Sequence, residues 1–88
     1  MGKVAAAYNL MPEDSEYPIE MIANAIPDAI PEDVQLSNLE VKPLAFGLKV
    51  IEALFLMQDI EGIVDRLEES LRNIPGLQNV ETISITLI

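Results

Sequence analysis

The sequence predicts an α+β sandwich of the ferredoxin-like type, in which a four-stranded antiparallel sheet carries two helices on one face. Apolar residues recur with the period of a strand or of a helix in the order β-α-β-β-α-β, and Pro or Gly residues separate the segments. Right-handed crossovers at both helices then place the first and third strands in the centre of the sheet. The length of 88 residues fits one domain, residues 1–88.

The most apolar segment, residues 48–57, predicts a central strand. Eight of its ten residues are apolar, only Lys49 and Glu52 interrupt them, and the segment contains neither Pro nor Gly. With the helices on one face only, the other face of the sheet is expected to stay open and apolar. The residues predicted for this open face are Ala5, Ala7, Leu48, Val50, Glu52, Leu54, Leu56, Thr82 and Ser84.

Two further strands are predicted before this central one. Residues 3–11 alternate and end at a proline, which predicts the first strand. The three alanines in this window lower its strand propensity and are also compatible with a helix. Residues 34–42 also alternate, but the apolar positions change phase between Leu36 and Leu39. A bulge near residues 37–38 would explain the change of phase, and polar residues on both faces indicate an edge strand.

The first helix is predicted for residues 18–30. Pro18 suits a first helical turn, and Ile19, Ile22, Ala23, Ile26 and Ile30 follow at helical spacing. Pro27 lies inside this pattern and removes a main-chain hydrogen bond, so we expect a kink or a break into a short last turn near Ala25.

The second helix and the last strand complete the pattern. Asp59 is the expected N-cap of a helix over residues 60–73, and Pro75 with Gly76 ends that helix. Residues 79–88 alternate, which predicts a strand with Ile83, Ile85 and Leu87 on one face and Thr82, Ser84 and Thr86 on the other.

Composition excludes several functions. Fifteen acidic residues against five scattered basic ones give a net charge of −10, which argues against direct binding of nucleic acid. The absence of Cys and His removes thiolate nucleophiles, the commonest general base and the usual zinc ligands. Adjacent acids occur at residues 13–14, 32–33 and 68–69, but no third group is spaced to converge with any pair. We therefore expect a protein that is not an enzyme and that has no cofactor and no metal site.

No segment has the length of a membrane span, so a cytoplasmic protein without a membrane partner is expected.

Several short motifs recur along the chain in a characteristic order. They are Met11-Pro12-Glu13, Ile30-Pro31-Glu32, residues 43–48 before the central strand, Asp59, Glu61-Gly62 and Glu68-Glu69-Ser70-Leu71. Together they resemble archaeal elongation factor 1-beta over the whole chain. The motif at residues 43–48 is the most distinctive, because it resembles the Gly-Phe-Gly turn of the eukaryotic exchange domain.

The resemblance implies a guanine nucleotide exchange factor that binds the GTPase elongation factor 1-alpha and promotes release of its GDP. It also implies a protein that is monomeric when free. The implied contact residues are Pro43, Leu44, Ala45, Phe46, Gly47, Leu87 and Ile88.

Phe46 and Leu87 each leave two interpretations open. Phe46 is either an aromatic that covers the sheet edge or, as the resemblance favours, an exposed anchor on a tight turn. Eukaryotic family members have a near-terminal lysine that reaches the magnesium site of the GTPase, whereas this sequence has Leu87 there. Either nucleotide exchange here does not use a terminal cation, or this protein displaces the switch region of the GTPase sterically. In a simpler interpretation, Leu87 and Ile88 are the last residues of a core strand.

A different class of function uses the open sheet face. Val50, Leu54 and Leu56 could pair two copies sheet to sheet or bind a small ligand, as in a regulatory module. In that alternative the resemblance to a translation factor is accidental.

Overall fold

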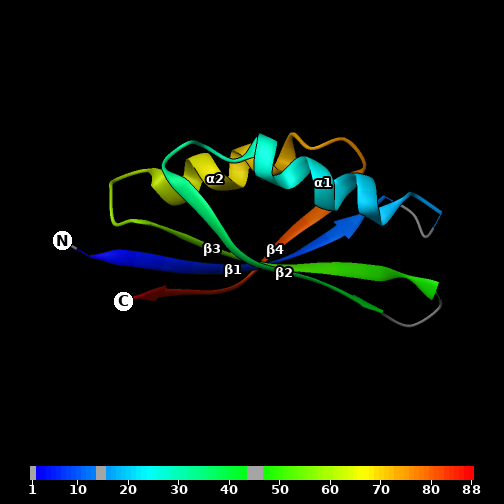
Figure 1. Ribbon diagram of the computed structural model, residues 1–88, viewed down its shortest axis with the longest axis horizontal. Helices are drawn as coiled ribbons and strands as arrows, with labels where there is room; N and C mark the ends of the chain where they lie inside the picture. Colours follow the sequence, from blue (N-terminus) through cyan, green and yellow to red (C-terminus); the bar gives the residue numbers. More distant parts are fainter. Residues whose placement is uncertain (1, 14–15, 44–46) are drawn as a thin grey trace.

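The computed structural model describes residues 2–13, 16–43 and 47–88. It has two layers, a β-sheet and a pair of helices that cover one face of the sheet (Figure 1). The four strands pair antiparallel in the order β2-β3-β1-β4. The predicted ferredoxin-like fold, with the first and third strands in the centre, is therefore confirmed. The elements are β1 (Lys3–Pro12), α1 (Ile19–Ala29), β2 (Val34–Pro43), β3 (Lys49–Gln58), α2 (Ile63–Arg72) and β4 (Leu77–Leu87).

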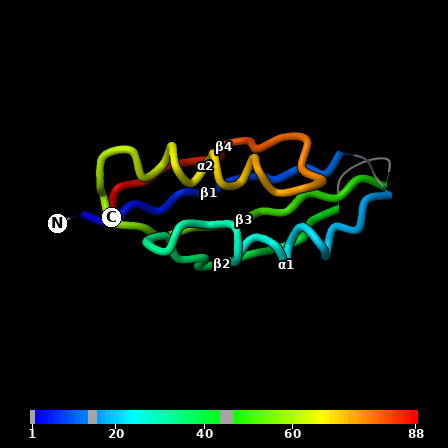
Figure 2. The backbone as a smooth tube through the Cα atoms, turned by 90° about the horizontal axis from the view of Figure 1, so that it is seen from above, coloured from blue at the N-terminus to red at the C-terminus, as the bar shows by residue number. Residues whose placement is uncertain are grey.

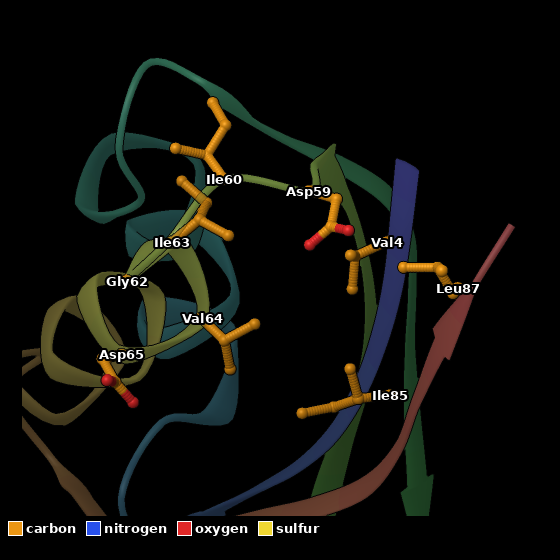
Figure 3. Close-up of a pocket in the computed structure, with 9 residues that line it drawn as sticks. All are labelled: Val4, Asp59, Ile60, Gly62, Ile63, Val64, Asp65, Ile85 and Leu87. Atoms are coloured by element: carbon orange, nitrogen blue, oxygen red, sulfur yellow. The ribbon is translucent and has the colours of Figure 1, made fainter. Parts of the chain in front are cut away.

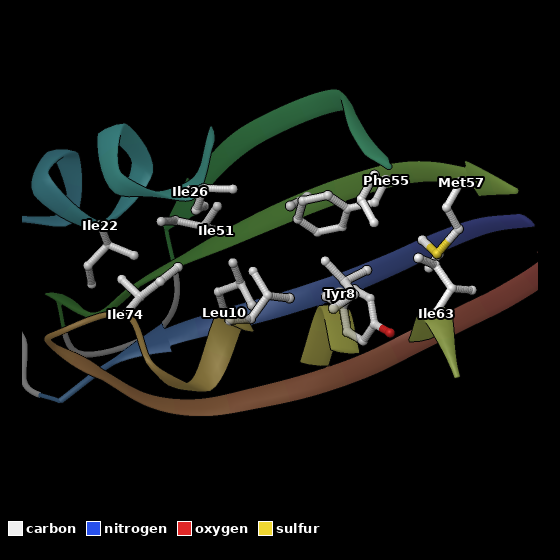
Figure 4. Packing of buried hydrophobic residues seen from close by; sticks show 14 of the residues in the cluster. Tyr8, Leu10, Ile22, Ile26, Ile51, Phe55, Met57, Ile63 and Ile74 are labelled. Atoms are coloured by element: carbon white, nitrogen blue, oxygen red, sulfur yellow. The ribbon is translucent and has the colours of Figure 1, made fainter. Parts of the chain in front are cut away.

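The hydrophobic core lies between the helices and the two central strands (Figure 4). Alternate residues of β1 point toward the helices, and the aromatic rings of Tyr8 and Phe55 meet there with their centroids 6.0 Å apart. Both side chains are fully buried, so each removes a large apolar surface from water. The largest buried neighbours are Leu10, Ile22, Ile26, Ile51, Ile63, Leu67 and Leu71.

The bulge predicted in β2 is present. The pairing of β2 with β3 shifts register between Leu36 and Asn38, so that Ser37 has no partner across the ladder. The extra residue restores the contact of Leu39 with the core after the change of phase, because Leu36 and Leu39 both pack against it. Most of β2 is exposed, as expected for an edge strand.

Helix α1 does not break at Pro27, so that part of the prediction is wrong. The helix runs through Pro27 to Ala29, and the N–H of Ile30 still donates to the carbonyl of Ile26 over 3.2 Å. Pro27 lies close enough to the helix end that few bonds follow it, and the burial of Ile26 holds the last turn against the sheet.

Helix α2 begins later than predicted, and Asp59 is not its N-cap. The cap position is Gly62, which has a positive φ of 79°. The chain first makes a turn after β3, in which the N–H of Ile63 donates to the carbonyl of Ile60 over 3.1 Å. This turn carries the chain from the sheet to the helix layer before the helix begins.

The clean alternation predicted for the last strand is wrong. The register between β1 and β4 shifts between Ala7 and Tyr8, so that Ser84 lies opposite Ala7 while Thr82 lies opposite Tyr8. Ile83 is thus an extra residue, and Thr82 shares the helix-facing side with Tyr8 instead of the open face with Ser84. A bulge in an edge strand leaves little trace in a sequence whose residues on both faces are exposed.

The open face of the sheet differs from the prediction at one further position. Ala5, Ala7, Leu54 and Leu56 are half-buried there, whereas Val50 retains only 5% of its exposure. Val50 is therefore no part of an accessible apolar surface.

Candidate partner-binding site

The described residues among the predicted partner contacts lie at opposite ends of the molecule. Leu87 pairs with Val4 at the beginning of β1, whereas Pro43 pairs with Lys49 at the beginning of β3. Because β1 and β3 are antiparallel, these two positions are separated by nearly the full length of the sheet, along an axis of 43 Å (Figures 1 and 2). The described residues among the predicted contacts therefore fall into two separate regions, each a candidate site.

The first site lies where β2 turns into β3, which we call the hairpin end. Pro43 is the last residue of β2, and Gly47 has a positive φ of 77°. A β-carbon built on Gly47 would meet no atom of the described residues within 4 Å, so the positive φ is the reason for a glycine here. The predicted contacts Leu44, Ala45 and Phe46 lie outside the described residues.

Two features surround the hairpin end. Lys42 Nζ donates to Glu52 Oε2 over 2.9 Å and lies 3.8 Å from Glu40, so it separates two carboxylates that face each other across β2 and β3. The hydrogen bond with Glu52 raises the pKa of the Lys42 ammonium group.

Beside the hairpin end is a cavity of about 210 Å³, which the sequence did not predict because its lining residues come from three different elements. It is lined by Pro12, Tyr17, Pro18, Ile19, Glu20 and Lys49.

The second site lies at the other end, between the beginning of α2 and the end of β4. A groove of about 330 Å³ opens there, with isoleucine, valine and leucine side chains pointing into it (Figure 3). We call it the α2–β4 groove. Its lining residues are Val4, Asp59, Ile60, Gly62, Ile63, Val64, Asp65, Ile85 and Leu87.

Several apolar side chains at this groove remain in contact with water. Ile60 and Ile85 are each 48% exposed, and Leu87 is 67% exposed. Ile88 is 71% exposed, and its N–H donates to the carbonyl of Lys3 over 2.8 Å. The interpretation of Leu87 and Ile88 as core residues is therefore wrong. Exposed apolar groups concentrated at one end of a domain indicate an interaction surface.

Two of the acidic pairs contribute ion pairs with arginine side chains. Asp33 pairs with Arg66 over 2.9 Å, and Glu68 pairs with Arg72 over 3.3 Å. Within residues 2–13, 16–43 and 47–88, no three His, Cys, Asp or Glu side chains converge to hold a metal ion. The same residues form no helix that is long and apolar enough to cross a membrane.

A ferredoxin-like fold with exposed apolar side chains at the α2–β4 groove is typical of a small protein-binding domain. Residues 5–88 match the family of EF-1 guanine nucleotide exchange domains. The chain belongs to this family, and its role is that of a guanine nucleotide exchange factor in translation elongation.

Curated relatives agree with this family over nearly their whole lengths. Elongation factor 1-beta from Methanothermobacter thermautotrophicus is 34% identical over 85 residues, which are 97% of this chain and 96% of the relative. Elongation factor 1-beta from Archaeoglobus fulgidus is 33% identical over 88 residues, which cover 100% of both chains.

One solved structure shares the fold without a close sequence. The C-terminal domain of MgtC from Mycobacterium tuberculosis superposes with a TM-score of 0.57 at 15% identity, covering 98% of this chain and 87% of that one. At this identity the likeness concerns the fold alone.

Proposed function

We propose that this protein binds the GTPase elongation factor 1-alpha in the cytoplasm and promotes release of its GDP, so that GTP can bind. The observation that carries the proposal is the exposed apolar end formed by Leu87, Ile88 and the α2–β4 groove in a chain of the EF-1 exchange family. Burial of such side chains by a partner stabilises the complex, because it removes apolar surface from water.

The proposed contacts reach two separate regions of the GTPase. Pro43 and Leu87 lie at opposite ends of a molecule 43 Å long, so one patch of the partner cannot touch both. A rigid rod that holds two regions of the partner favours one arrangement of those regions. If that arrangement has low affinity for GDP, binding of the exchange factor and of GDP oppose each other, and GDP leaves. No bond is made or broken in this mechanism, so the protein acts as a binding partner and not as an enzyme.

At the C-terminal end we propose that the effect is steric. Leu87 is uncharged and exposed, and the residues that line the neighbouring groove include no base. An apolar side chain can displace a switch segment of the GTPase, but it cannot compete with magnesium as a cation would. The exposed Lys3 lies beside Ile88 in the ladder and supplies the matched control for a cationic role.

Stopped-flow release of a fluorescent GDP analogue from the cognate GTPase tests the proposal. We expect the release rate to rise with the concentration of this protein and to saturate. Leu87→Ala should lower the saturating rate, whereas Lys3→Met should leave it unchanged. A release rate that does not change at saturating protein would remove the proposed function. Loss of rate in Lys3→Met alone would show that a cation, not Leu87, acts at this end.

A further inference from the structure

The outer edge of β4 has free hydrogen-bonding groups at the C-terminal end. β4 is the last strand of the sheet, so only one of its edges is paired, with β1. The N–H of Ile88 donates to Lys3 in that ladder. Since main-chain groups alternate direction along a strand, the N–H and C=O groups of Thr86 also point to β1, and those of Ile85 and Leu87 point outward. No other backbone hydrogen bond among the described residues reaches these outward groups.

The side chains of the same two residues line the α2–β4 groove. Ile85 and Leu87 lie opposite Ala6 and Val4, both of which face the helices, so their side chains project to the helix side of the sheet (Figure 3). A strand that paired with the outward groups of β4 would place its own alternate side chains beside this groove. The bulge at Ile83 ends this regular stretch, so the available edge is short.

Charge decides which kind of segment fits there. Asp59 and Asp65 line the groove, and no lysine or arginine does. The whole chain carries a charge of −10, so a second copy placed edge to edge would bring like charges together. A basic segment would meet opposite charge instead.

We propose that the α2–β4 groove and the outer edge of β4 bind an extended segment of the partner GTPase, which adds to the sheet as a fifth strand. The segment presents apolar side chains to Ile85 and Val64 and at least one lysine or arginine to Asp65. This inference rests on the proposed function for the identity of the partner. It goes beyond that function in assigning main-chain pairing, groove residues and the charge of the bound segment.

Amide hydrogen exchange on the complete protein, free and with saturating nucleotide-free GTPase, tests the main-chain pairing. In the free protein the amides of Ile85 and Leu87 should exchange fast, whereas the Thr86 amide, which points to β1, should already be protected. In the complex, the Ile85 and Leu87 amides should slow at least about tenfold. Fast exchange of both amides in the complex would overturn the inference.

Side-chain variants test the groove by equilibrium binding to the GTPase. Ile85→Ala should weaken affinity about tenfold, and Thr86→Ala, its neighbour on the opposite face, should not. Asp65→Asn should weaken binding more at low salt than at high salt, whereas Glu69→Gln, an exposed acid on the same helix outside the groove, should not. Melting curves of all four variants verify that each is folded. Equal affinities for Ile85→Ala and Thr86→Ala in folded proteins would also overturn the inference.

The outcomes separate this inference from the proposed function, because GDP release is measured on the same samples. Accelerated release without protection of Ile85 and Leu87 overturns only the fifth strand. Protection without accelerated release overturns the exchange function and supports the binding mode. Protection that grows with the concentration of this protein alone shows that a second copy is the occupant, and then the GTPase segment is wrong.

Discussion

The hydroxyl of Tyr8 donates a hydrogen bond of 3.1 Å to Oε2 of Glu68 and thereby joins the centre of β1 to α2. Tyr8 is fully buried, and Glu68 is in turn held by Arg72 over 3.3 Å. The only polar atom of the Tyr8 side chain is thus satisfied inside an apolar core, which limits how α2 can slide over the sheet.

Removing this hydrogen bond should lower stability without changing the fold. Tyr8→Phe keeps the ring contact with Phe55 but loses the bond to Glu68, so the free energy of unfolding should fall by about 1 kcal/mol, or about 4–8 °C in melting temperature. Tyr8→Leu is the comparison, since it also removes the ring and should cost more. A Tyr8→Phe protein that melts like the wild type would show that the bond contributes nothing net.

The same bond predicts a loss of stability at alkaline pH. Burial, and then the Glu68 carboxylate, raise the pKa of the Tyr8 hydroxyl above its ordinary value. A group with a raised pKa stabilises the fold fully below its unfolded pKa of about 10, and this stability is lost as the pH rises above that value. Urea unfolding at increasing pH should therefore show the stability of the wild type falling relative to that of Tyr8→Phe, which has no phenol to ionise, by up to about 1.4 kcal/mol per pH unit above 10. The wild type, which is more stable at neutral pH, should become the less stable of the two. Parallel curves for the two proteins would contradict this assignment.

Phe46 is predicted to be the aromatic anchor at the hairpin end. Phe46→Ala should then reduce affinity for the GTPase by about 2 kcal/mol or more, a loss of roughly thirtyfold, with little change in the melting curve. If Phe46 belongs to the core, the same change should cost about 3–5 kcal/mol of stability instead. Measuring melting and GDP release on one sample distinguishes the two roles. Wild-type values for both would withdraw residues 43–47 from the site.

Gly47 tests whether the shape of this turn matters for exchange. Its φ of 77° is unfavourable for a β-branched residue, although there is open space for a side chain. Gly47→Val should therefore slow GDP release through the turn alone, and Gly47→Asn, which tolerates a positive φ, should retain most of the rate. Equal rates for the two variants would show that the conformation of the turn is unimportant.

Gly76 marks a close approach between the α2–β4 connection and Tyr17. A β-carbon on Gly76 would clash with the Tyr17 ring, and the φ of 88° adds backbone strain. Gly76→Ala should therefore destabilise the domain by about 1–3 kcal/mol in thermal unfolding. In the double variant with Tyr17→Ala the two changes should couple, so that the added alanine costs less than it does alone. Strict additivity would mean that the ring moves aside without cost.

The sequence by itself determined the order of elements and the core. Periodicity is local, so the apolar run of residues 48–57 and the phase slip of β2 were enough to predict a central strand and a bulge. The handedness of the crossovers then left one strand order. The motifs along the chain were enough to indicate the family, because a motif, like periodicity, is a local property of the sequence and does not depend on tertiary contacts.

Only the tertiary structure decided where the site residues lie relative to one another. Pro43 and Leu87 are both predicted contacts of the same partner, but they lie at opposite ends of the sheet, because antiparallel pairing sets their separation. The start of α2 at Ile63 depends on the turn needed to rise from the sheet, which no local propensity at Asp59 encodes. The exposure of Ile85 and Leu87 likewise depends on the groove that separates α2 from the end of β4. The spacing between two packed elements cannot be deduced from the periodicity of either one.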